Sequence, residues 1–462
     1  MGRDVRGTRS LMSLQAAIDH YHDKLTDELG ADSQEQLETL QRSRNLYFGD
    51  RPLCTVLRPR FLTMSQYRFL QERCALLLSA FATAHRAALE NPTFRGQFRL
   101  FDWEEALLQA DPMREQPSPL SRLDAFFDTD GKALHFTEYN AETPAGPAYN
   151  DALADLFLAL PAMRPFLKRF EARALAVRSM TLHALMRAFV SWRGRSERPR
   201  IAIVDWWREV PTYSEFQLFE QYFRDNGFEC VIADPRELEY RDGKLMAGDY
   251  HITLIYKRVL LSELMERCGA DNAIVRAVTG NAVCMVDSFA CKILHKKASL
   301  AVLSDERNAS LFSADERATI DAHIPWTRVI EERRTTLEGR AIDLIPHISD
   351  HREQFVLKPN DEYGGKGIVL GWEVSDQQWA QAVRDALAAP AIIQKRITLP
   401  SEAYPSFVDG KVEIASRMLD TAPYAFDGNV VDGCLTRLST AMLLNVTAGG
   451  GSTVPTFVIE PR

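Results

Sequence analysis

Short apolar runs alternate with amphipathic stretches in the middle of the chain. Residues 200–205, 228–234 and 251–256 are rich in aliphatic side chains and predict three buried strands. Residues 213–226 have apolar positions at helical spacing and predict a helix between the first two strands. This order indicates a βαβ unit in a parallel sheet. Arg258 follows the third strand at the edge where such sheets bind ligands. A plain strand end with a solvated charge is the alternative.

The first 115 residues predict mostly helix. Apolar positions recur at helical spacing over residues 10–46, where we expect two helices separated near Gly30. The same spacing over residues 64–90 predicts one long helix, and residues 52–57 predict a strand before it. This region by itself indicates no function.

Helical spacing returns in two later segments. Residues 147–192 predict helices with a break at Pro161 and Pro165, because proline removes a backbone donor inside a helix. A polar segment, 193–199, then indicates an exposed linker. Residues 375–389 predict a second amphipathic helix. Strands are expected after it at 391–397 and 411–419.

A glycine-rich turn lies between two apolar runs in residues 355–370. Lys358 ends the first run. The turn carries three glycines around one lysine: Gly364, Gly365, Lys366 and Gly367. Glycines let backbone N–H groups approach a bulky anion, and the two lysines would add positive charge. No helix opens after the turn, so this is not the Walker pattern. The segment therefore predicts a lid for a triphosphate, and an ordinary β-hairpin is the alternative.

A second hairpin is predicted over residues 121–140, with its turn centred on Gly131. Opposed residues then place Asp124 across from Glu138. Because side chains alternate faces along a strand, Arg122 and Asn140 lie on the same face as these two acids. Two carboxylates, an amide and a guanidinium on one face indicate Mg²⁺ with bound phosphate. A solvated hairpin face is the alternative.

Composition limits the class of protein. The chain has 462 residues, enough for two or three domains, and its net charge of -8 argues against a nucleic-acid partner. Its seven cysteines include no CxxC pair and predict reduced thiols. The sequence has neither a signal-peptide pattern nor an apolar run long enough to span a bilayer. We therefore expect a cytoplasmic protein without a membrane partner, and both a monomer and a homodimer remain open.

These segments together resemble the ATP-grasp superfamily, and more narrowly its circularly permuted branch, which includes the synthetase domain of glutathionylspermidine synthetase. Lys358, the glycine-rich turn and residues 394–397 follow one another as in an ordinary ATP-grasp enzyme. Residues 138–144 (Glu-Tyr-Asn-Ala-Glu-Thr-Pro) are similar to the family's Glu-Tyr-Asn-Ala-Asp-Thr-Pro, with Glu142 as the departure. The pair Arg122-x-Asp124 matches its Arg-x-Asp. The acids precede Lys358 instead of following it, as a circular permutation would leave them.

The resemblance covers roughly residues 50–462 and implies an α/β (α+β) fold. It would combine a circularly permuted ATP-grasp, a pre-ATP-grasp parallel-sheet domain and an N-terminal helical region. The expected segments are an N-terminal, mostly helical region (1–115), permuted grasp strands with the metal site and helices (116–195), the pre-ATP-grasp domain (196–292) and the ATP-binding grasp region (293–462).

The resemblance also implies ATP and Mg²⁺ as cofactors and a role for each site residue. The implied metal ligands are Asp124, Glu138 and Asn140. The phosphates would contact Lys297, Lys358, Gly364, Gly365, Lys366 and Gly367, with Lys296 as an alternative to Lys297. The adenine edge would come from Gln394, Lys395, Arg396 and Ile397. Arg122 would stabilise the transferring group, and Arg258 and Arg437 would bind the substrate carboxylate.

The implied activity is an ATP-dependent ligation of a carboxylate to an amine through an acylphosphate. Its substrates would be small molecules: an amino acid, a small peptide or a polyamine. The alternatives are a non-catalytic nucleotide-binding module and a phosphotransferase of the same fold. Two structural expectations follow. Glu138 and Lys358 should lie in one site, and repulsion between Asp124 and Glu138 should raise the pKa of at least one of them.

Overall fold

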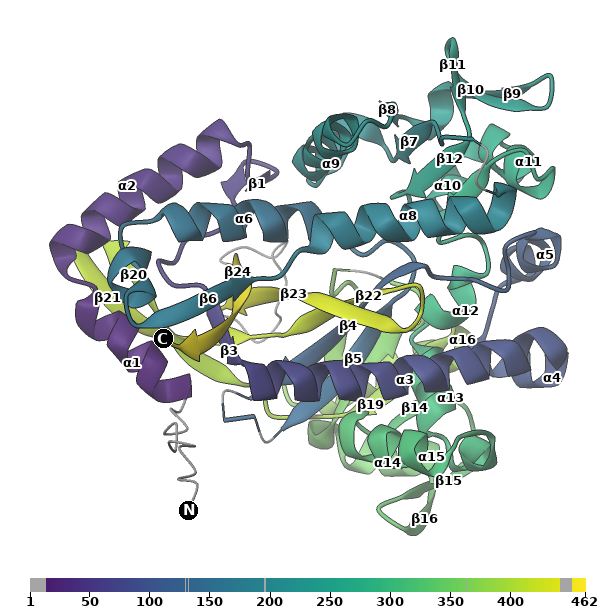
Figure 1. Ribbon diagram of the computed structural model, residues 1–462. Helices are drawn as coiled ribbons and strands as arrows, with labels where there is room; N and C mark the ends of the chain where they lie inside the picture. The colour runs from purple at the N-terminus through teal and green to yellow at the C-terminus, as the bar shows by residue number, and fades with distance from the viewer. Residues whose placement is uncertain (1–13, 129, 132, 195–196, 363, 441–450) are drawn as a thin grey trace, which may run out of the picture.

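The largest sheet has nine strands and is built from distant parts of the chain (Figure 1). The computed structural model describes residues 14–128, 130–131, 133–194, 197–362, 364–440 and 451–462. The strand order is β20-β21-β23-β22-β4-β5, and β24 pairs with β23, β3 and β6. These strands are β3 Arg60–Thr63, β4 Leu120–Phe127, β5 Leu134–Asn140, β6 Phe170–Ala174, β20 Ser401–Val408, β21 Lys411–Leu419, β22 Ala422–Phe426, β23 Val430–Ser439 and β24 Ser452–Pro461. Three of the four expected segments thus contribute strands to one sheet.

Helices run along both sides of this sheet. Helices α6 (Pro147–Ala159) and α8 (Val177–Arg193) lie along one side, and α3 (Met64–Glu90) lies along the other (Figure 1). The long helix predicted over residues 64–90 is thereby confirmed. It begins at a capping box in which Thr63 accepts from the backbone of Gln66 and the Gln66 side chain accepts in return. Apolar side chains of α3, including Leu70, Leu77 and Phe81, are buried in a core shared with β4 and β5.

A separate four-stranded parallel sheet confirms the predicted βαβ unit. Its order is β13-β12-β7-β8, and all its pairings are parallel. Its elements are β7 Ile201–Val204, β8 Cys230–Ala233, β12 Leu254–Lys257 and β13 Cys284–Val286, with α9 Tyr213–Asp225 between β7 and β8. All four residues of β7 are buried, which explains the continuous apolar run in its sequence. The third strand begins later than predicted, because Tyr250–Ile252 pairs instead in a small antiparallel sheet as β11.

The glycine-rich turn belongs to a third sheet, of order β14-β19-β17-β18. It connects β17 (Phe355–Pro359) to β18 (Val369–Leu370), and these two strands pair antiparallel. Strand β19 (Ala391–Lys395) pairs with β17 on the other side. Helices α15 (Leu344–Asp350) and α16 (Asp376–Ala388) share an apolar core with β17 and β19. The strand and helix predictions for residues 355–395 are therefore confirmed.

The hairpin of β4 and β5 has the predicted register at its functional end. Asp124 pairs with Glu138, and Arg122 pairs with Asn140. Nearer the turn the register shifts by one, with Ala125 opposite Phe136. The extra residue is therefore Thr137, in a β-bulge that simple alternation did not predict.

Three predicted boundaries were wrong. The first two helices, α1 (Leu14–Lys24) and α2 (Asp27–Ser43), are separated at Thr26, which caps α2 by accepting from the backbone of Leu29. Gly30 lies inside α2, where a Cβ would come within 2.4 Å of Val412 Cγ2. The strand predicted at 52–57 is only β2, Arg51–Pro52. The region 147–192, predicted to be helical, contains α7 (Met163–Leu167) and also the edge strand β6, whose helix-favouring composition concealed it.

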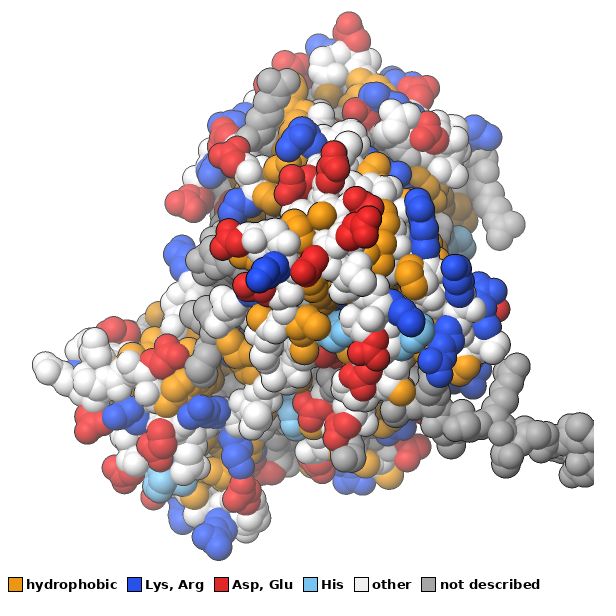
Figure 2. Space-filling view, turned by 90° about the vertical axis from the view of Figure 1, so that its left-hand side faces the viewer, with side chains coloured by type: hydrophobic (Ala, Val, Ile, Leu, Met, Phe, Trp, Pro, Cys, Tyr) orange, Lys and Arg blue, Asp and Glu red, His pale blue; other side chains and the backbone are white. Residues whose placement is uncertain are grey.

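The remaining elements are short. They are β1 Tyr47–Phe48, α4 Pro92–Arg95, α5 Asp102–Ala110, α7 Met163–Leu167, β9 Leu238–Arg241, β10 Lys244–Ala247, α10 Leu261–Cys268, α11 Ala273–Thr279, α12 Cys291–His295, α13 Ala298–Ser304, α14 Ala314–His323, β14 Thr327–Val329, β15 Arg334–Leu337 and β16 Arg340–Asp343. None of the described helices is long and apolar enough to cross a membrane. Acidic and basic side chains are interspersed over the face shown in Figure 2.

Candidate functional site

One cavity of about 380 Å³ brings together the two halves of the chain that the sequence singled out. The β4–β5 hairpin contributes Asp124 and Glu138 to its lining. Strand β17 contributes Lys358, and the following turn contributes Gly364 and Gly365. The residues predicted for an adenine edge line the same cavity: Gln394, Lys395, Arg396 and Ile397. The expectation that Glu138 and Lys358 lie in one site is therefore confirmed. We refer to this space as the first cavity.

Asp124 is buried and bonded to two arginines. Arg122 Nε donates to its Oδ1 at 2.6 Å, and an Nη of Arg437 donates to its Oδ2 at 2.8 Å. Arg437 also bonds Asp420, whose carboxylate is 2.5 Å from the guanidinium. Burial opposes the ionisation of Asp124, but the charges of Arg122 and Arg437 outweigh it and hold the pKa of Asp124 well below its usual range. Asp124 is therefore ionised at neutral pH, and its carboxylate oxygens could act as metal ligands.

Glu138 is bonded to a lysine from the other half of the chain. Lys297 Nζ donates to Glu138 Oε1 at 2.9 Å and to the backbone oxygen of Glu362 at 2.6 Å. Burial acts to raise the pKa of Glu138, but the Lys297 charge outweighs it and the pKa is lowered. Glu138 is therefore ionised as well.

The expected rise in pKa for the Asp124–Glu138 pair was wrong. The two acids are cross-strand neighbours and their charges do repel, but each has its own cationic partner. The raised pKa belongs instead to Asp420, mainly because it is buried and also because Asp124 lies near it. No motif indicated Asp420, which follows β21.

Within the described part of the chain, no carboxylate is bonded to Lys358. Its Nζ donates to Gln394 Oε1 at 2.7 Å and to the backbone oxygen of Thr137 at 3.3 Å, so the bulge residue of β5 positions the lysine. Gln394 is fixed in turn by its donation to Thr327 Oγ1 at 3.0 Å. Burial lowers the pKa of Lys358 to about 8, although Glu138 acts to raise it. A lysine with neutral partners in a buried pocket can accept an anionic ligand without first breaking an ion pair.

The structure distinguishes the two adjacent lysines that lie between α12 and α13. Lys297 contacts Glu138 in the site, whereas Lys296 is fully buried in another direction, 2.7 Å from Glu104 and 2.9 Å from Asp361. Lys296 belongs to a buried ionic cluster with four further members: Lys292, Glu104, Glu142 and Asp361. Sequence analysis did not predict this cluster, although the spacing of Lys292 and Lys296 puts both on one side of a helical turn.

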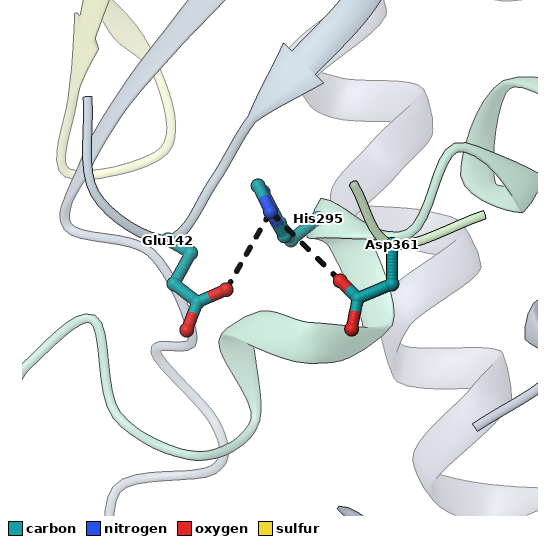
Figure 3. A group of neighbouring side chains, drawn as sticks. All are labelled: Glu142, His295 and Asp361. Carbon is teal, nitrogen blue, oxygen red and sulfur yellow. Dashed lines mark ion pairs between the residues drawn. The ribbon is translucent and has the colours of Figure 1, made fainter. Parts of the chain in front are cut away.

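A metal-like arrangement occurs where His295 meets two acids of this cluster. Figure 3 shows Glu142, His295 and Asp361 converging from three segments, with one potential ligand atom of each lying within 4.8 Å of the others. The Lys292 ammonium lies among them, 3.2 Å from Glu142 and 2.6 Å from Asp361. It supplies the positive charge that a metal ion would supply. Asp361 directly precedes the glycine-rich turn, so Lys292 fixes the base of that turn to the residues after β5.

A second cavity of about 330 Å³ adjoins the first. Both are lined by the same four residues, which we call the shared wall: Asp124, Glu138, Gly364 and Arg437. Arg122, Asn140 and Arg258 also line the second cavity. Arg258 is not free there, because its guanidinium is 3.4 Å from Glu215 and donates to the hydroxyl of Tyr256 at 3.2 Å. Of the three expected metal ligands, Asp124 and Glu138 thus lie at this boundary, and Asn140 lines the second cavity only.

Other predicted residues are at the rim. Lys366 is exposed at 76% of its side chain and pairs with Glu362 at 3.5 Å. Lys395 pairs with Glu338, and Arg396 lies 4.0 Å from the centre of the Trp372 ring. Neither Lys366 nor Gly367 lines the first cavity. Gly367 has a φ of +71°, and a Cβ there would lie 2.7 Å from Pro359 Cγ, which explains the glycine structurally.

The donor set of the shared wall fits Mg²⁺. Asp124 and Glu138 are both ionised, and the Asn140 side chain adds an amide oxygen on the same strand face. Carboxylate and amide oxygens are the ligands that this ion accepts, and it commonly shares them with substrate phosphates. In the structure the cations Lys297 and Arg437 contact these carboxylates.

Comparisons with known proteins agree with this architecture. No family model matches the chain. The fold is similar to a glutathione synthetase-like effector from Globodera pallida, with a TM-score of 0.60, 10% identity, and coverage of 97% of this chain and 98% of that one. This likeness gives the fold as a mixed α/β architecture of the glutathione synthetase-like type.

Two curated relatives match shorter segments. A Frankia casuarinae protein named "Putative glutamate--cysteine ligase 2-2" is 25% identical over 268 residues, 48% of this chain and 29% of that protein. An uncharacterised protein of Mycobacterium tuberculosis is 32% identical over 145 residues, 30% of this chain and 25% of that protein. The matched segments thus span less than a third of each curated relative.

Proposed function

We propose that the chain is an ATP-dependent carboxylate–amine ligase with a circularly permuted ATP-grasp architecture. The observation that carries the proposal is the shared wall. Two cavities meet at Asp124, Glu138, Gly364 and Arg437, so a nucleotide in one cavity would present its terminal phosphate to a substrate in the other. A ligase of this kind needs such a junction, because its first step transfers a phosphoryl group between two bound molecules.

In this proposal ATP occupies the first cavity. Residues 394–397 contact the adenine edge, and Lys297, Lys358 and the glycine-rich turn contact the phosphates. Asp124, Glu138 and Asn140 bind Mg²⁺, which neutralises charge on the phosphates during transfer. The matched segment order supports the permutation, since the acids that complete this site come from a hairpin that precedes Lys358 in the chain. The segments 1–115, 116–195, 196–292 and 293–462 are proposed as its parts.

In this proposal the carboxylate and amine substrates bind in the second cavity, and the reaction has two steps. A substrate carboxylate oxygen attacks the γ-phosphorus of ATP, the bond to the β–γ bridging oxygen breaks, and ADP leaves. The amine nitrogen of the second substrate attacks the resulting acylphosphate carbonyl and loses a proton, and inorganic phosphate leaves. In this proposal Arg122 and Arg437 stabilise negative charge on the transferring group, and the position of both guanidiniums at Asp124 supports this role. Arg258, which lines the second cavity and not the first, is proposed to contact the carboxylate substrate.

The test is a screen of amino acids, small peptides and polyamines, in pairs, for release of ADP and phosphate. A ligase releases phosphate only when carboxylate and amine are both present, and mass spectrometry shows a product one water lighter than their sum. ADP release with a stable phosphorylated product would instead identify a phosphotransferase. Mg-ATP binding without turnover in any pair would favour a nucleotide-binding module. Glu138→Gln should lose turnover in this screen. Its matched control is Glu373→Gln, which alters an exposed acid after β18 that lines neither cavity.

A further inference from the structure

The second cavity has apolar surface beside its charged residues. Four of its lining residues, which we call the apolar patch, do not line the first cavity: Phe48, Val210, Pro211 and Leu260. Pro211 is exposed, and the other three are partly exposed. None of them is assigned above to ATP, Mg²⁺ or the transferring group. The proposed reaction therefore leaves this surface without a role.

Phe48 is held in place on both sides by the backbone of β1, which lies beside α6 and α9 (Figure 1). The preceding carbonyl oxygen, that of Tyr47, accepts from the hydroxyls of Tyr149 at 3.1 Å and Ser214 at 2.8 Å. The backbone N–H that follows Phe48 donates to the carbonyl oxygen of Pro211 at 3.0 Å. Phe48 is therefore fixed next to a segment that lies more than 160 positions later in the chain.

The other part of the apolar patch lies at the edge of the parallel sheet. Val210 follows β7, and Leu260 follows β12, which pairs with β7. Val210 packs against the apolar core that contains Val259 and Leu261, the two neighbours of Leu260 in sequence. The carboxyl ends of such strands are where open α/β sheets bind ligands. The N-terminal region and the parallel sheet thus build the patch together.

The charged residues near the patch are bonded within the protein. Asp205 accepts from the backbone N–H of Trp206 at 2.8 Å, and Glu263 accepts from the indole N–H of Trp206 at 2.7 Å. Arg258 donates to the hydroxyl of Tyr256 at 3.2 Å. Asp205 and Arg258 are each 6% exposed, and every residue of the apolar patch is more exposed than these two. The patch therefore presents more of its surface than these two charged side chains do.

Apolar surface in an open cavity favours an apolar ligand group. Contact between the two removes apolar area of both from water. A polar group in the same place would lose hydrogen bonds to water without replacing them. The volume of about 330 Å³ is close to the lower end of the range of about 300–1,000 Å³ for small-molecule sites, so it suits a small ligand.

We infer that the carboxylate substrate of the second cavity carries an aliphatic or aromatic group, which packs on the apolar patch while its carboxylate lies at the shared wall. The substrate class is a small carboxylic acid, such as an amino acid, with an apolar side chain. Phe48 is then a specificity-determining residue that the N-terminal region contributes to the site. The inference rests on the proposed ligase function and adds the class of acid that it uses.

The experiment measures the binding of isosteric acids by calorimetry in the presence of Mg²⁺ and a non-hydrolysable ATP analogue. The pairs are L-leucine with L-asparagine and 4-methylpentanoate with succinamate. Within each pair an isopropyl group replaces a carboxamide at nearly constant shape. At least one apolar acid should bind, and its carboxamide partner should bind at least tenfold more weakly.

Three variants and one control test the apolar patch. Phe48→Asn and Leu260→Asn should each reduce the ratio of apolar to polar affinity at least fivefold, whereas Phe48→Leu should retain most of it. A purely structural role for Phe48 would lower both affinities in the same proportion and leave the ratio unchanged. The control Leu387→Asn alters a residue of α16 that is 43% exposed and lines neither cavity, so it should change neither affinity.

The outcomes separate this inference from the function on which it rests. The inference is overturned if the carboxamide acids bind as tightly as the apolar acids, or if both asparagine variants keep the wild-type ratio. It is also overturned if no acid of either pair binds to a wild-type protein that binds the nucleotide analogue. A wild-type protein that does not bind Mg²⁺ with the analogue would refute the ligase proposal itself, and the inference would fall with it.

Discussion

Glu138→Gln tests the electrostatics of the shared wall directly. The substitution keeps the shape of the side chain and removes its charge. Sequence reasoning alone expects it to relieve repulsion between Asp124 and Glu138. The structure predicts the opposite, because Asp124 is already paired with Arg122 and Arg437, while Glu138 is the carboxylate bonded to Lys297. The variant should therefore be less stable than the wild-type protein without ligand.

The magnitude follows from the burial of the pair. Removing one partner of a buried ion pair costs about 3–5 kcal/mol. Lys297 is 5% exposed, but Glu138 is 28% exposed, and a glutamine can still accept a hydrogen bond from Lys297. We therefore expect a loss of about 1–3 kcal/mol in the free energy of unfolding. With an unfolding entropy of about 2.1 cal/mol/K per residue, a chain of 462 residues that unfolds as one unit loses about 1–3 °C in Tm.

Scanning calorimetry of four proteins isolates this effect: wild type, Glu138→Gln, Lys297→Met and the double variant. The double variant should regain part of the stability that Glu138→Gln loses, because it no longer contains a buried unpaired ammonium group. The exposed control Glu373→Gln should melt with the wild type. With Mg-ATP at a hundredfold excess over Kd, the wild type should gain about 2.7 kcal/mol and Glu138→Gln far less. A ligand-free Glu138→Gln protein that melts at or above the wild-type temperature refutes the ion-pair argument. Wild-type ATP turnover by this variant refutes the metal role.

Four further results are expected. Mg-ATP affinity should fall as pH rises above about 8, because unliganded Lys358 loses its proton there. The Lys358→Met variant should bind Mg-ATP weakly at all pH values, without this dependence. Calorimetric titration at several pH values checks both results. Limited proteolysis within residues 364–367 should slow when Mg-ATP binds, and equal cleavage with and without nucleotide would contradict the lid role. Lys292→Met should lower the unfolding free energy by about 3 kcal/mol, because Glu142 and Asp361 then keep, among the described residues, only Lys257 and Lys296 as cationic partners, and Lys292→Arg should recover part of this in urea unfolding. ATP without Mg²⁺ should raise Tm less than Mg-ATP does, and equal shifts would argue against a metal at the shared wall.

Sequence periodicity predicted the elements that are either buried on all sides or buried along one continuous face. The parallel strand β7 is buried on both faces and α3 is amphipathic over its whole length, so both have the composition that their periods require. Edge strand β6 does alternate between its more buried residues and the exposed Glu171 and Arg173, but it is only five residues long and its Glu, Ala and Arg residues favour helix, so it was missed. The separation of α1 from α2 depends on the cap at Thr26, while Gly30 is small because α2 packs closely on Val412.

The candidate site was predictable only as far as its motifs extend. Register and alternation placed Asp124 and Glu138 together, because the hairpin is local. Arg122, predicted on the same face, is the cation that lowers the pKa of Asp124 most, but Arg437, which lowers it further, and Lys297, which lowers the pKa of Glu138, are 313 and 159 positions away from their partners and were not predictable. Asp420 and the Lys292 cluster carry no motif at all. Such long-range ion pairs form only when the three sheets assemble, and no local pattern records them.

The shared wall has a consequence for how ligands enter. Its carboxylates are ionised because Lys297, Arg122 and Arg437 neutralise them, and the same cations are the groups proposed to contact phosphate. Binding of nucleotide with metal is then an exchange of partners, in which the carboxylates pass to Mg²⁺ and the cations pass to phosphate oxygens. Neither half of the exchange is favourable alone, because a buried carboxylate or a buried cation would lose its partner. The ligand-free site is therefore charge-balanced and ordered, and Lys358, which pairs with no carboxylate among the residues that the structure describes, is the group able to contact phosphate first.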